Sequence, residues 1–346
     1  MGLGNSLQTA QAASGGGGVG GWVELARTTL GSTGDDITVS SLADKRYYMV
    51  LHDHRPTGGS ANAKYRFGNS TLDTGSNYAS RYSDNGGTDG TNLSDTAMLT
   101  RFGERAFNSF GVSYIANLSA KEKLLQTSVV NQNTAGAGTA PQRFESVHKH
   151  AFTSNPIDVI GAVNSAGGDM AVGAELVVLG WDPTDTHTSN FWEELASVEL
   201  GGASSTLDSG TFTAKKYLWV QAYINATTVD TGLTFNGDTG TNYARRWSDD
   251  GGTDGTATGG NNIQVDRGNS TQFLNIFILN NSANEKLGMY HTGTQNTAGA
   301  ANSPQRRELI FKWVNTSSQI TSMIFTKKGS GTDLQAGSII KVWGSD

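Results

Sequence analysis

The chain has 346 residues, of which 45 are Gly, 5 are Pro and none is Cys, and its formal net charge is -6 from 25 basic and 31 acidic residues. The missing cysteines exclude disulfides and thiolate metal sites, and the glycines follow no Gly-x-y collagen period. The acidic balance argues against broad binding to nucleic-acid phosphates, and no apolar run reaches the roughly 18 residues of a membrane span. We therefore expect a soluble, turn-rich protein whose partners include neither nucleic acid nor a membrane.

The first 21 residues form an arm that has no counterpart later in the chain. Residues 14–21 (SGGGGVGG) are a hinge by composition, because glycine-rich segments have few preferred backbone conformations. Such arms often become ordered only against a partner. The sequence leaves two alternatives for residues 1–21, an anchoring role in an assembly or plain disorder.

The rest of the chain is a tandem repeat. Residues 22–26 (WVELA) return as residues 192–196 (WEELA), and residues 73–91 return as residues 238–256 with 15 of 19 positions identical. A repeat this long has the size of a domain, whereas solenoid repeats run to about 20–50 residues. We predict a duplicated domain, with copy one over residues 22–183, a linker over residues 184–190 and copy two over residues 191–346.

Each copy is predicted to consist of short strands between turns. The segments are 4 to 10 residues long, rich in Val, Ile, Tyr and Phe, and separated by Gly, Asn and Asp clusters. In copy one they cover residues 22–30, 37–42, 46–52, 64–67, 78–83, 110–118, 123–130, 144–152, 157–163 and 175–181, and in copy two the most apolar segment covers residues 273–279. We expect an all-β protein of two tandem homologous antiparallel β-sandwich domains, jelly-roll-like, with an immunoglobulin-like strand order as the alternative.

Two acidic loops are candidate calcium sites. The loops SDNGGTDG and SDDGGTDG each carry three side chains with oxygen atoms, and oxygen is the ligand that calcium prefers. These residues are Asp84, Asn85, Asp89, Asp249, Asp250 and Asp254. The spacing matches neither the helix-flanked twelve-residue calcium loop nor the nonapeptide β-roll repeat. The favoured alternative is a tight turn in which Asp and Asn bond the local backbone and Gly supplies positive φ. We therefore expect no cofactor, with calcium as the alternative.

An arginine next to an aromatic residue precedes each acidic loop. These pairs are Arg81 with Tyr82 in copy one and Arg246 with Trp247 in copy two. Such a pair can stack on sugars or nucleobases. The alternative is that the arginine forms an ion pair with the following aspartates while the ring enters the core.

Four histidines of copy one form two pairs in predicted strands. The two members of each pair are two residues apart, so their side chains lie on the same face of the strand. They are His52 with His54 and His148 with His150, and copy two has Ala222, Ile224, Phe311 and Trp313 in their places. Paired histidines could bind zinc. The apolar replacements favour a half-buried or interface face instead.

The sequence contains no motif of a known enzyme class. There is no G-x-S-x-G elbow, no H-E-x-x-H helix and no phosphate-binding loop. Carboxylate pairs such as Glu193 with Glu194 exist, and a glycosidase needs only two facing carboxylates. Solvated surface charge is the simpler interpretation, so we expect no enzyme activity and no catalytic residue.

The phrases FNGDTGTNYARRWSDDGGTDGT, QNTAGAANSPQRRELIFKW and GSIIKVWGSD resemble β-rich virion proteins of tailed bacteriophages, especially marine ones. The resemblance covers residues 22–346 and implies a capsid decoration, minor capsid or fibre protein located in the virion. It also implies self-association into a homo-oligomer and contact with other capsid or tail proteins. Two alternatives are a carbohydrate- or receptor-binding adhesin, which would contact host surface glycans, and a polysaccharide-degrading enzyme.

Overall fold

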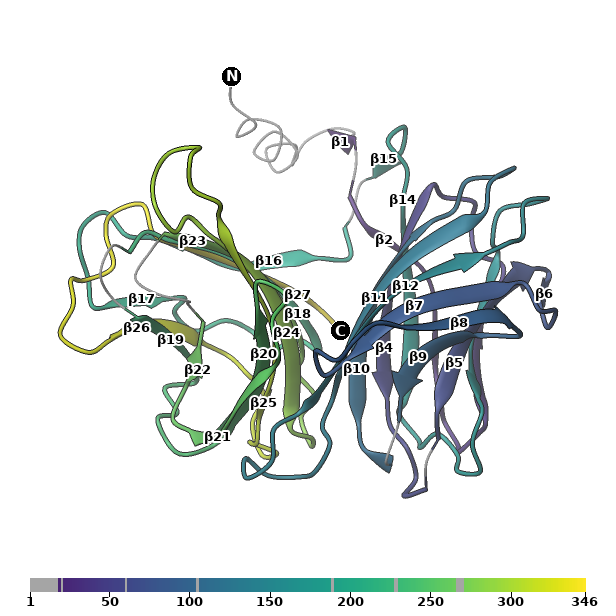
Figure 1. The fold of residues 1–346 in the computed structure, drawn as a ribbon, viewed down its shortest axis with the longest axis horizontal. Coiled ribbons are helices and arrows are strands. Elements are labelled where there is room, and N and C mark those ends of the chain that lie inside the picture. Colours follow the sequence, from purple (N-terminus) through teal and green to yellow (C-terminus); the bar gives the residue numbers. More distant parts are fainter. Residues whose placement is uncertain are drawn as a thin grey trace. The chain divides into compact units, whose positions relative to one another are not determined.

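The computed structural model describes residues 18–19, 21–59, 61–103, 106–187, 190–226, 230–265 and 271–346. These residues form antiparallel β-sheets, so the prediction of an all-β fold is confirmed (Figure 1). Within them no helix is long and apolar enough to cross a membrane. Most of the arm predicted over residues 1–21 lies outside the described residues. Its described part includes β1 (Gly18–Val19), which pairs with β15 (Thr186–His187).

The chain divides into two compact units. Unit 1 consists of the described residues up to 82 together with residues 89–129 and 145–192. Unit 2 consists of residues 83–88, 130–144 and 193–346. The boundaries drawn from the repeat differ from these units at two hairpin tips, residues 83–88 and 130–144, which belong to copy one in sequence and to unit 2 by contact. They also differ at residues 191 and 192, which were assigned to copy two and belong to unit 1.

The first sandwich has sheets of eight and five strands. The eight-stranded sheet has the order β2 (Val23–Thr29), β14 (Glu175–Trp181), β4 (Tyr47–His54), β10 (Ser109–Ala116), β11 (Lys123–Asn131), β12 (Gln142–His150), β7 (Tyr78–Asp84) and β8 (Gly90–Asp95). The other sheet has the order β3 (Asp36–Val39), β13 (Val159–Asn164), β5 (Ala63–Asn69) and β6 (Thr71–Leu72), and β9 (Met98–Phe102) also pairs with β5.

The second sandwich repeats this plan with sheets of eight and four strands. The eight-stranded sheet has the order β16 (Glu193–Glu199), β27 (Ile339–Ser345), β18 (Tyr217–Ile224), β23 (Gln272–Leu279), β24 (Lys286–Thr294), β25 (Gln305–Trp313), β20 (Tyr243–Asp249) and β21 (Gly255–Gly260). The other has the order β17 (Thr206–Asp208), β26 (Met323–Lys328), β19 (Asp230–Phe235) and β22 (Ile263–Gln264).

The two sandwiches share even their irregularities. The register of β2 on β14 shifts at Leu25, and that of β16 on β27 shifts at Leu195, so each first strand carries a bulge at the same place. On the partner strand, a glycine lies close to the side chain of each bulge residue. A Cβ on Gly180 would lie 2.5 Å from the Leu25 side chain, and one on Gly344 would lie 2.7 Å from that of Leu195. The duplication predicted from sequence is therefore a duplication of the fold, with the same strand order and the same bulge.

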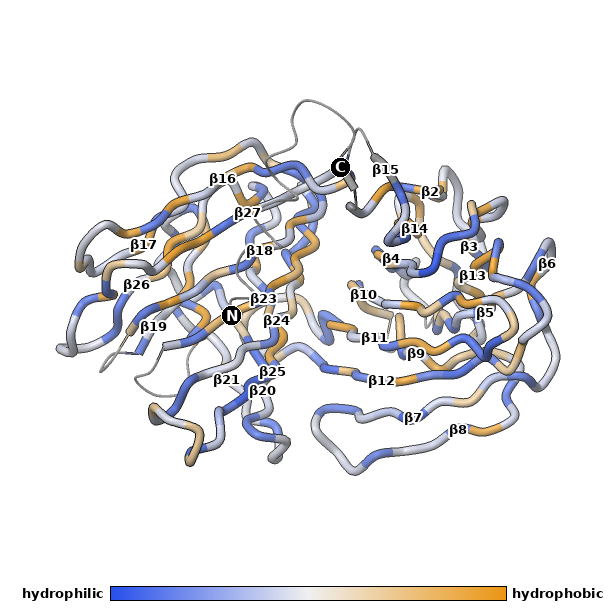
Figure 2. Tube along the Cα trace, turned by 90° about the horizontal axis from the view of Figure 1, so that it is seen from above, coloured by the Kyte–Doolittle hydropathy of each residue, from blue (hydrophilic) through white to orange (hydrophobic). Residues whose placement is uncertain are grey.

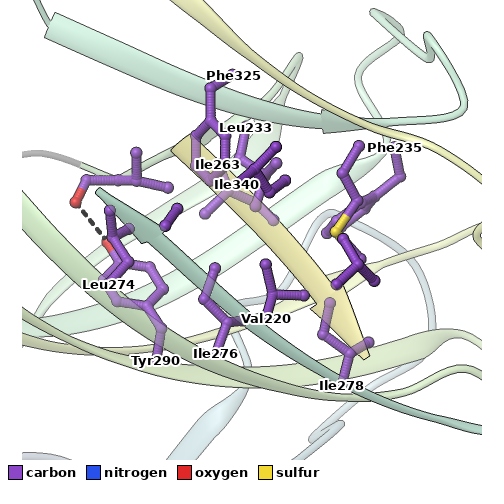
Figure 3. Close-up of a cluster of buried hydrophobic side chains, with 14 of the residues drawn as sticks. Val220, Leu233, Phe235, Ile263, Leu274, Ile276, Ile278, Tyr290, Phe325 and Ile340 are labelled. Carbon is purple, nitrogen blue, oxygen red and sulfur yellow. Dashed lines mark hydrogen bonds between the residues drawn. The ribbon is translucent and has the colours of Figure 1, made fainter. Parts of the chain in front are cut away.

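Each core lies between the two sheets of its unit. Along β18 and β23, alternate residues point inward, as the two-residue period of a strand requires. Figure 3 shows Val220, Leu274, Ile276 and Ile278 from these strands in one buried cluster with Phe325 of the four-stranded sheet. Figure 2 shows the same alternation as hydrophobic and hydrophilic colours that change along the strands. Burial of these side chains contributes about 25 cal/mol per Å² of apolar surface, and it is the main force that holds the sheets together.

The core of unit 1 contains the four histidines, which corrects the expectation of a half-buried or interface face. His52 and His54 are fully buried and lie against Phe102, and His148 and His150 are 4% and 0% exposed. Burial lowers the pKa of His54 to about 4 and that of His148 to about 4, and it lowers the pKa of His52 and His150 as well. These side chains fill the positions that apolar residues fill in unit 2, so the sequence comparison indicated the packing but underestimated its depth.

Candidate functional site

The outer face of the eight-stranded sheet of unit 1 contains a hollow. We use "outer face" for the side of each eight-stranded sheet that points away from the other sheet of its unit. Because side chains alternate along a strand, Tyr48 enters the core while its neighbour Tyr47 lies on the outer face. The hollow has a volume of about 760 Å³ and is formed by β4, β7, β8, β10, β11, β12 and β14 together with Trp22.

Large apolar side chains lie exposed on this face. Leu93, Leu124 and Val147 are at least half exposed, and Tyr47 and Tyr114 are each 37% exposed. All five line the hollow. Scattered exposed apolar residues are normal, but five around one hollow form a contiguous patch, and such patches mark binding surfaces.

Two aromatic pairs border the hollow. The rings of Tyr47 and Trp181 stack with centroids 5.5 Å apart and planes 20° apart. The rings of Trp22 and Tyr114 are tilted, with centroids 6.3 Å apart. Burial of its hydroxyl raises the pKa of Tyr114, so this phenol stays neutral at physiological pH. The stacked pair is a rigid flat platform, because each ring fixes the other in place.

Polar residues form the rest of the lining. Arg81 and Lys149 are both more than half exposed, and each has a loose ion pair, with Asp89 at 3.8 Å and Glu122 at 3.6 Å respectively. Gln126, Thr91 and Ser80 add neutral hydrogen-bonding groups. No Asp or Glu is among the described residues that line the hollow. The surface is therefore apolar in its centre with cations at its margin.

The outer face of the sheet in unit 2 is different. Leu287, Met289 and Ile310 occupy the positions of Leu124, Gln126 and Val147, and all three are buried. Residues 130–144, which belong to unit 2, run along this side of the sheet, as the hydrogen bond from Lys312 Nζ to the Gln132 carbonyl at 3.2 Å shows. Equivalent faces of the two units are thus open in unit 1 and occupied in unit 2.

The acidic loops begin with tight turns, although the Asn85 and Asp250 side chains bond distant backbone groups and not the local backbone that the turn alternative expected. Asn85 and Gly86 have φ of 51° and 70°, and the Gly87 N–H donates to the Asp84 carbonyl at 2.9 Å. Asp250 and Gly251 repeat this with φ of 50° and 74°. Two central residues with positive φ are typical of the hairpin turns that match the twist of paired strands, and the DNGG and DDGG sequences supply the residues that tolerate this conformation.

The side chains of these loops already have partners in the chain. The Asn85 side-chain oxygen accepts from the Arg143 N–H at 2.9 Å, and that of Asp250 accepts from the Arg306 N–H at 2.9 Å. Asp249 accepts two hydrogen bonds from the Arg307 guanidinium, at 2.7 and 3.1 Å.

Two further acids of the loops, Asp89 and Asp254, also pair with arginines. Among the described residues no group of three His, Asp or Glu side chains could hold a metal ion. Calcium at these loops stays a hypothesis that the turn geometry does not need.

The arginine–aromatic pairs are arranged differently from a free stacking platform. In copy two, the guanidinium carbons of Arg245 and Arg307 lie 5.2 and 5.6 Å from the centre of the Trp247 ring, which also packs against the core. Arg246 donates to the Pro141 carbonyl at 2.9 Å. In copy one, Tyr82 is half-buried with the Arg101 guanidinium 5.7 Å from its ring centre. Cation–π contacts therefore occupy both rings.

Of the predicted binding residues, only Arg81 lies in the hollow. Three of the aromatic residues that line it, Tyr47, Tyr114 and Trp181, lie in strands that were predicted. The exposure of Tyr47 could not be predicted, because β4 reads YYMVLHDH and carries apolar residues on both faces.

Comparisons with known proteins add no identification. No protein-family model matches the sequence, and no curated protein matches it. Functional inference for this chain therefore rests on its residues, its repeat and the geometry of its outer faces.

Proposed function

We propose that the protein is a non-enzymatic structural component of a virus particle, of the capsid-decoration, minor-capsid or fibre kind, which assembles through its β-domains and its N-terminal arm. The observation that carries this proposal is the open outer face of unit 1, where Tyr47, Leu93, Tyr114, Leu124 and Val147 expose a contiguous apolar surface. Such a surface is costly in water and favours a covering partner. The resemblance to phage virion proteins and the duplication support the same proposal.

The experiment is mass spectrometry of gradient-purified particles made from the genome that encodes this chain. We expect the chain to co-purify with the particles at a fixed ratio to the major capsid protein, and an antibody against it to label the particle surface in electron micrographs. A chain that separates completely from the particles in the gradient would contradict the proposal.

A carbohydrate- or receptor-binding adhesin is the second candidate, and the stacked Tyr47–Trp181 pair favours it. A sugar ring presents an apolar face that packs on a flat aromatic ring, and the exposed Gln126, Arg81 and Lys149 could bond its hydroxyls. A polysaccharide-degrading enzyme has less support at this place, because a glycosidase uses two carboxylates and none lines the hollow.

If the hollow binds glycans, replacement of its aromatic platform will remove the binding. We expect Trp181→Ala to weaken binding of a hit from a glycan array at least tenfold in titration calorimetry, because the stacking surface is lost. Tyr223→Ala is the matched control, since Tyr223 is 43% exposed on the outer face of the sheet in unit 2. Equal affinity of the wild type and Trp181→Ala would place the glycan elsewhere or exclude this function.

A further inference from the structure

In unit 2, residues 130–144 are held on the outer face by a lysine and a glutamate. Lys312 donates from Nζ to the carbonyls of Gln132, at 3.2 Å, and Thr134. Glu285 accepts from the Gly136 N–H at 2.5 Å. Lys312 is fully buried and Glu285 is 8% exposed. These contacts are made to backbone groups of the segment, so they depend on its backbone conformation and not on the identity of its side chains.

The other end of the same segment is held by an ion pair. Arg143 donates to Asp254 at 2.6 Å, and the Asp254 side chain is only 2% exposed. Next to it, Arg246 donates to the Pro141 carbonyl at 2.9 Å, and the Gly259 N–H donates to the Ala137 carbonyl at 2.8 Å. The Arg143 guanidinium bonds both oxygens of the Asp254 carboxylate, and a buried pair of this kind fixes the geometry of its two partners more tightly than an exposed pair does.

Unit 1 has counterparts of the unit 2 residues that bind this segment, but in unit 1 these residues are exposed. The repeat aligns Lys312, Glu285, Asp254, Arg246 and Gly259 with Lys149, Glu122, Asp89, Arg81 and Ser94. The side chains of Asp89 and Lys149 are 52% and 51% exposed. Even the backbone is preserved, since Ser94 has φ of 51° and Gly259 has φ of 58°. Lys149 and Arg81 line the hollow of unit 1.

Copy two has the matching segment, and it is exposed as well. Residues 295–306 (QNTAGAANSPQR) align with residues 132–143 (QNTAGAGTAPQR), with 9 of 12 positions identical. Residues 295–304 are all exposed, and the Arg306 side chain is 62% exposed. The outer face of unit 2 is thus occupied by residues 132–143. The equivalent outer face of unit 1 and the equivalent segment, residues 295–306, are both exposed.

We propose that residues 295–306 of one molecule bind the outer face of unit 1 in a second copy of this chain, with the contacts that residues 132–143 make in unit 2. Arg306 then pairs with Asp89, Lys149 binds the carbonyls of Gln295 and Thr297, and Glu122 accepts from the Gly299 N–H. The interface is head-to-tail, so its repetition gives a closed ring or a filament. It rests on the proposed function in that it supplies the self-assembly that a particle component needs.

The existing contacts of these residues do not compete strongly. Arg81 with Asp89 and Lys149 with Glu122 are exposed pairs at 3.8 and 3.6 Å, whereas the 62% exposed Arg306 side chain pairs at 2.8 Å with Glu308, whose side chain is only 12% exposed. Exposed pairs stabilise a protein by about 0–1 kcal/mol, so they rearrange at little cost. The exposed apolar side chains of Leu124 and Val147 lie on the same face, and their equivalents in unit 2, Leu287 and Ile310, are buried.

The test is a charge swap on the full-length protein, read by light scattering after size exclusion and by sedimentation. We expect the wild type to form an oligomer, and Asp89→Arg or Arg306→Asp alone to raise its dissociation constant at least tenfold. The double variant, Asp89→Arg with Arg306→Asp, should restore affinity to within about threefold of wild type, because the pair is re-formed with reversed signs. Glu199→Arg, an exposed acid on β16, is the control and should change nothing.

A second measurement uses the absence of cysteine in this chain. Ser94→Cys and Ala300→Cys in separate preparations should form an intermolecular disulfide on mixing and mild oxidation, since the equivalent Gly259 and Ala137 are joined by a backbone hydrogen bond. As the control, Ser94→Cys mixed with Ser205→Cys should not cross-link, because Ser205 is exposed but lies outside residues 295–306. A monomeric wild type, no rescue by the double swap, or equal cross-linking of both cysteine pairs would overturn the inference. If those results appear for a chain that co-purifies with particles, the interface is wrong and the proposed function stands.

Discussion

Mild acid should unfold unit 1 before unit 2. Four histidines are buried in unit 1, whereas His291 is the only histidine among the described residues of unit 2, and it is exposed. In the unfolded chain a histidine has a pKa of about 6.5. In the folded unit, burial lowers the pKa of His54 and of His148 to about 4, because the protonated ring would lose its hydration.

The sign follows from proton binding in the two states. Below pH 6.5 the unfolded chain takes up protons that the folded unit does not, so the free energy of unfolding falls as the pH falls from 6.5 towards 4. For His54 and His148 the loss is about 2 kcal/mol each at pH 5. The pKa of His52 and His150 is lowered too, so they add to the loss. The total is a large part of the stability of a domain, which is about 5–15 kcal/mol.

Most of the polar groups that face these histidines are neutral, so they do not oppose the lowering of the histidine pKa by burial. His52 contacts Tyr65 with 3.3 Å between Nδ1 and Oη, and His148 lies 2.7 Å from the hydroxyls of Ser80 and Ser146, so their polar neighbours are neutral. Only His150 bonds a carboxylate, Asp73 at 2.9 Å, which partly opposes the effect of burial on its pKa. Asp53 next to His54 is bound by Arg55.

Pulsed hydrogen exchange at one labelling pH, after incubation at pH 8, 6 and 5, measures this in the intact chain. We expect peptides from β4 and β12 to lose protection by pH 5 while those from β18 and β25 keep it. His54→Ile, which copies Ile224 of unit 2, should remove about 2 kcal/mol of the pH dependence. His291→Ala is the control and should leave it unchanged. Equal loss of protection in both units would disprove a histidine-specific cause.

Much of the fold could be predicted from the sequence, because strand residues alternate and turn residues are distinctive. Each of the ten segments predicted in copy one overlaps a strand, and residues 273–279 lie in β23. Strands β6 and β9 were missed, and so were β8 and β21. The sequences of β8 and β21, GTNLSD and GTATGG, contain almost no apolar residue, and they become strands because the turns at Asn85 and Asp250 fold them back onto β7 and β20.

The site was less predictable, for a reason that lies in β4 and its neighbours. Tyr47 and Tyr48 are adjacent and equally apolar, so sequence does not tell which enters the core. The answer depends on the second sheet, whose pairing is set by contacts far apart in the chain. The comparison of copies held more information than either copy alone. Lys149 and Lys312 are aligned and chemically identical, yet one is exposed and the other is fully buried.

Loss of one buried amide in each unit should cost about as much as loss of a large core side chain. Asn280 follows β23, and it donates to the carbonyls of Lys215 and Ile320 at 3.0 and 3.1 Å. Its side-chain oxygen accepts from the Ile320 N–H at 2.6 Å. In unit 1, Asn117 follows β10 and makes the same kind of bond, accepting from the Ile157 N–H at 2.7 Å. Each asparagine thus ties the end of a strand in the large sheet to the segment that enters the small sheet.

Asn280→Ala would leave the Ile320 N–H and two carbonyls buried without their partner. An unsatisfied buried group costs about 1–3 kcal/mol, so we expect the free energy of unfolding to fall by about 3 kcal/mol in urea titrations followed by tryptophan fluorescence. Asn117→Ala should have a similar effect on unit 1. Asn302→Ala, at an exposed position, should stay within about 0.5 kcal/mol of wild type.

Asn280→Asp separates the two halves of the effect, because a carboxylate keeps the acceptor for the Ile320 N–H but loses the donor to the carbonyls. At neutral pH it also places a negative charge against those two carbonyl oxygens, so it should destabilise at least as much as Asn280→Ala. Protonation of that carboxylate restores one donor, so the deficit relative to wild type should shrink between pH 7 and pH 5. A loss below 1 kcal/mol for Asn280→Ala, or an Asp variant as stable as wild type at pH 7, would show that the amide does not hold the strand end in place.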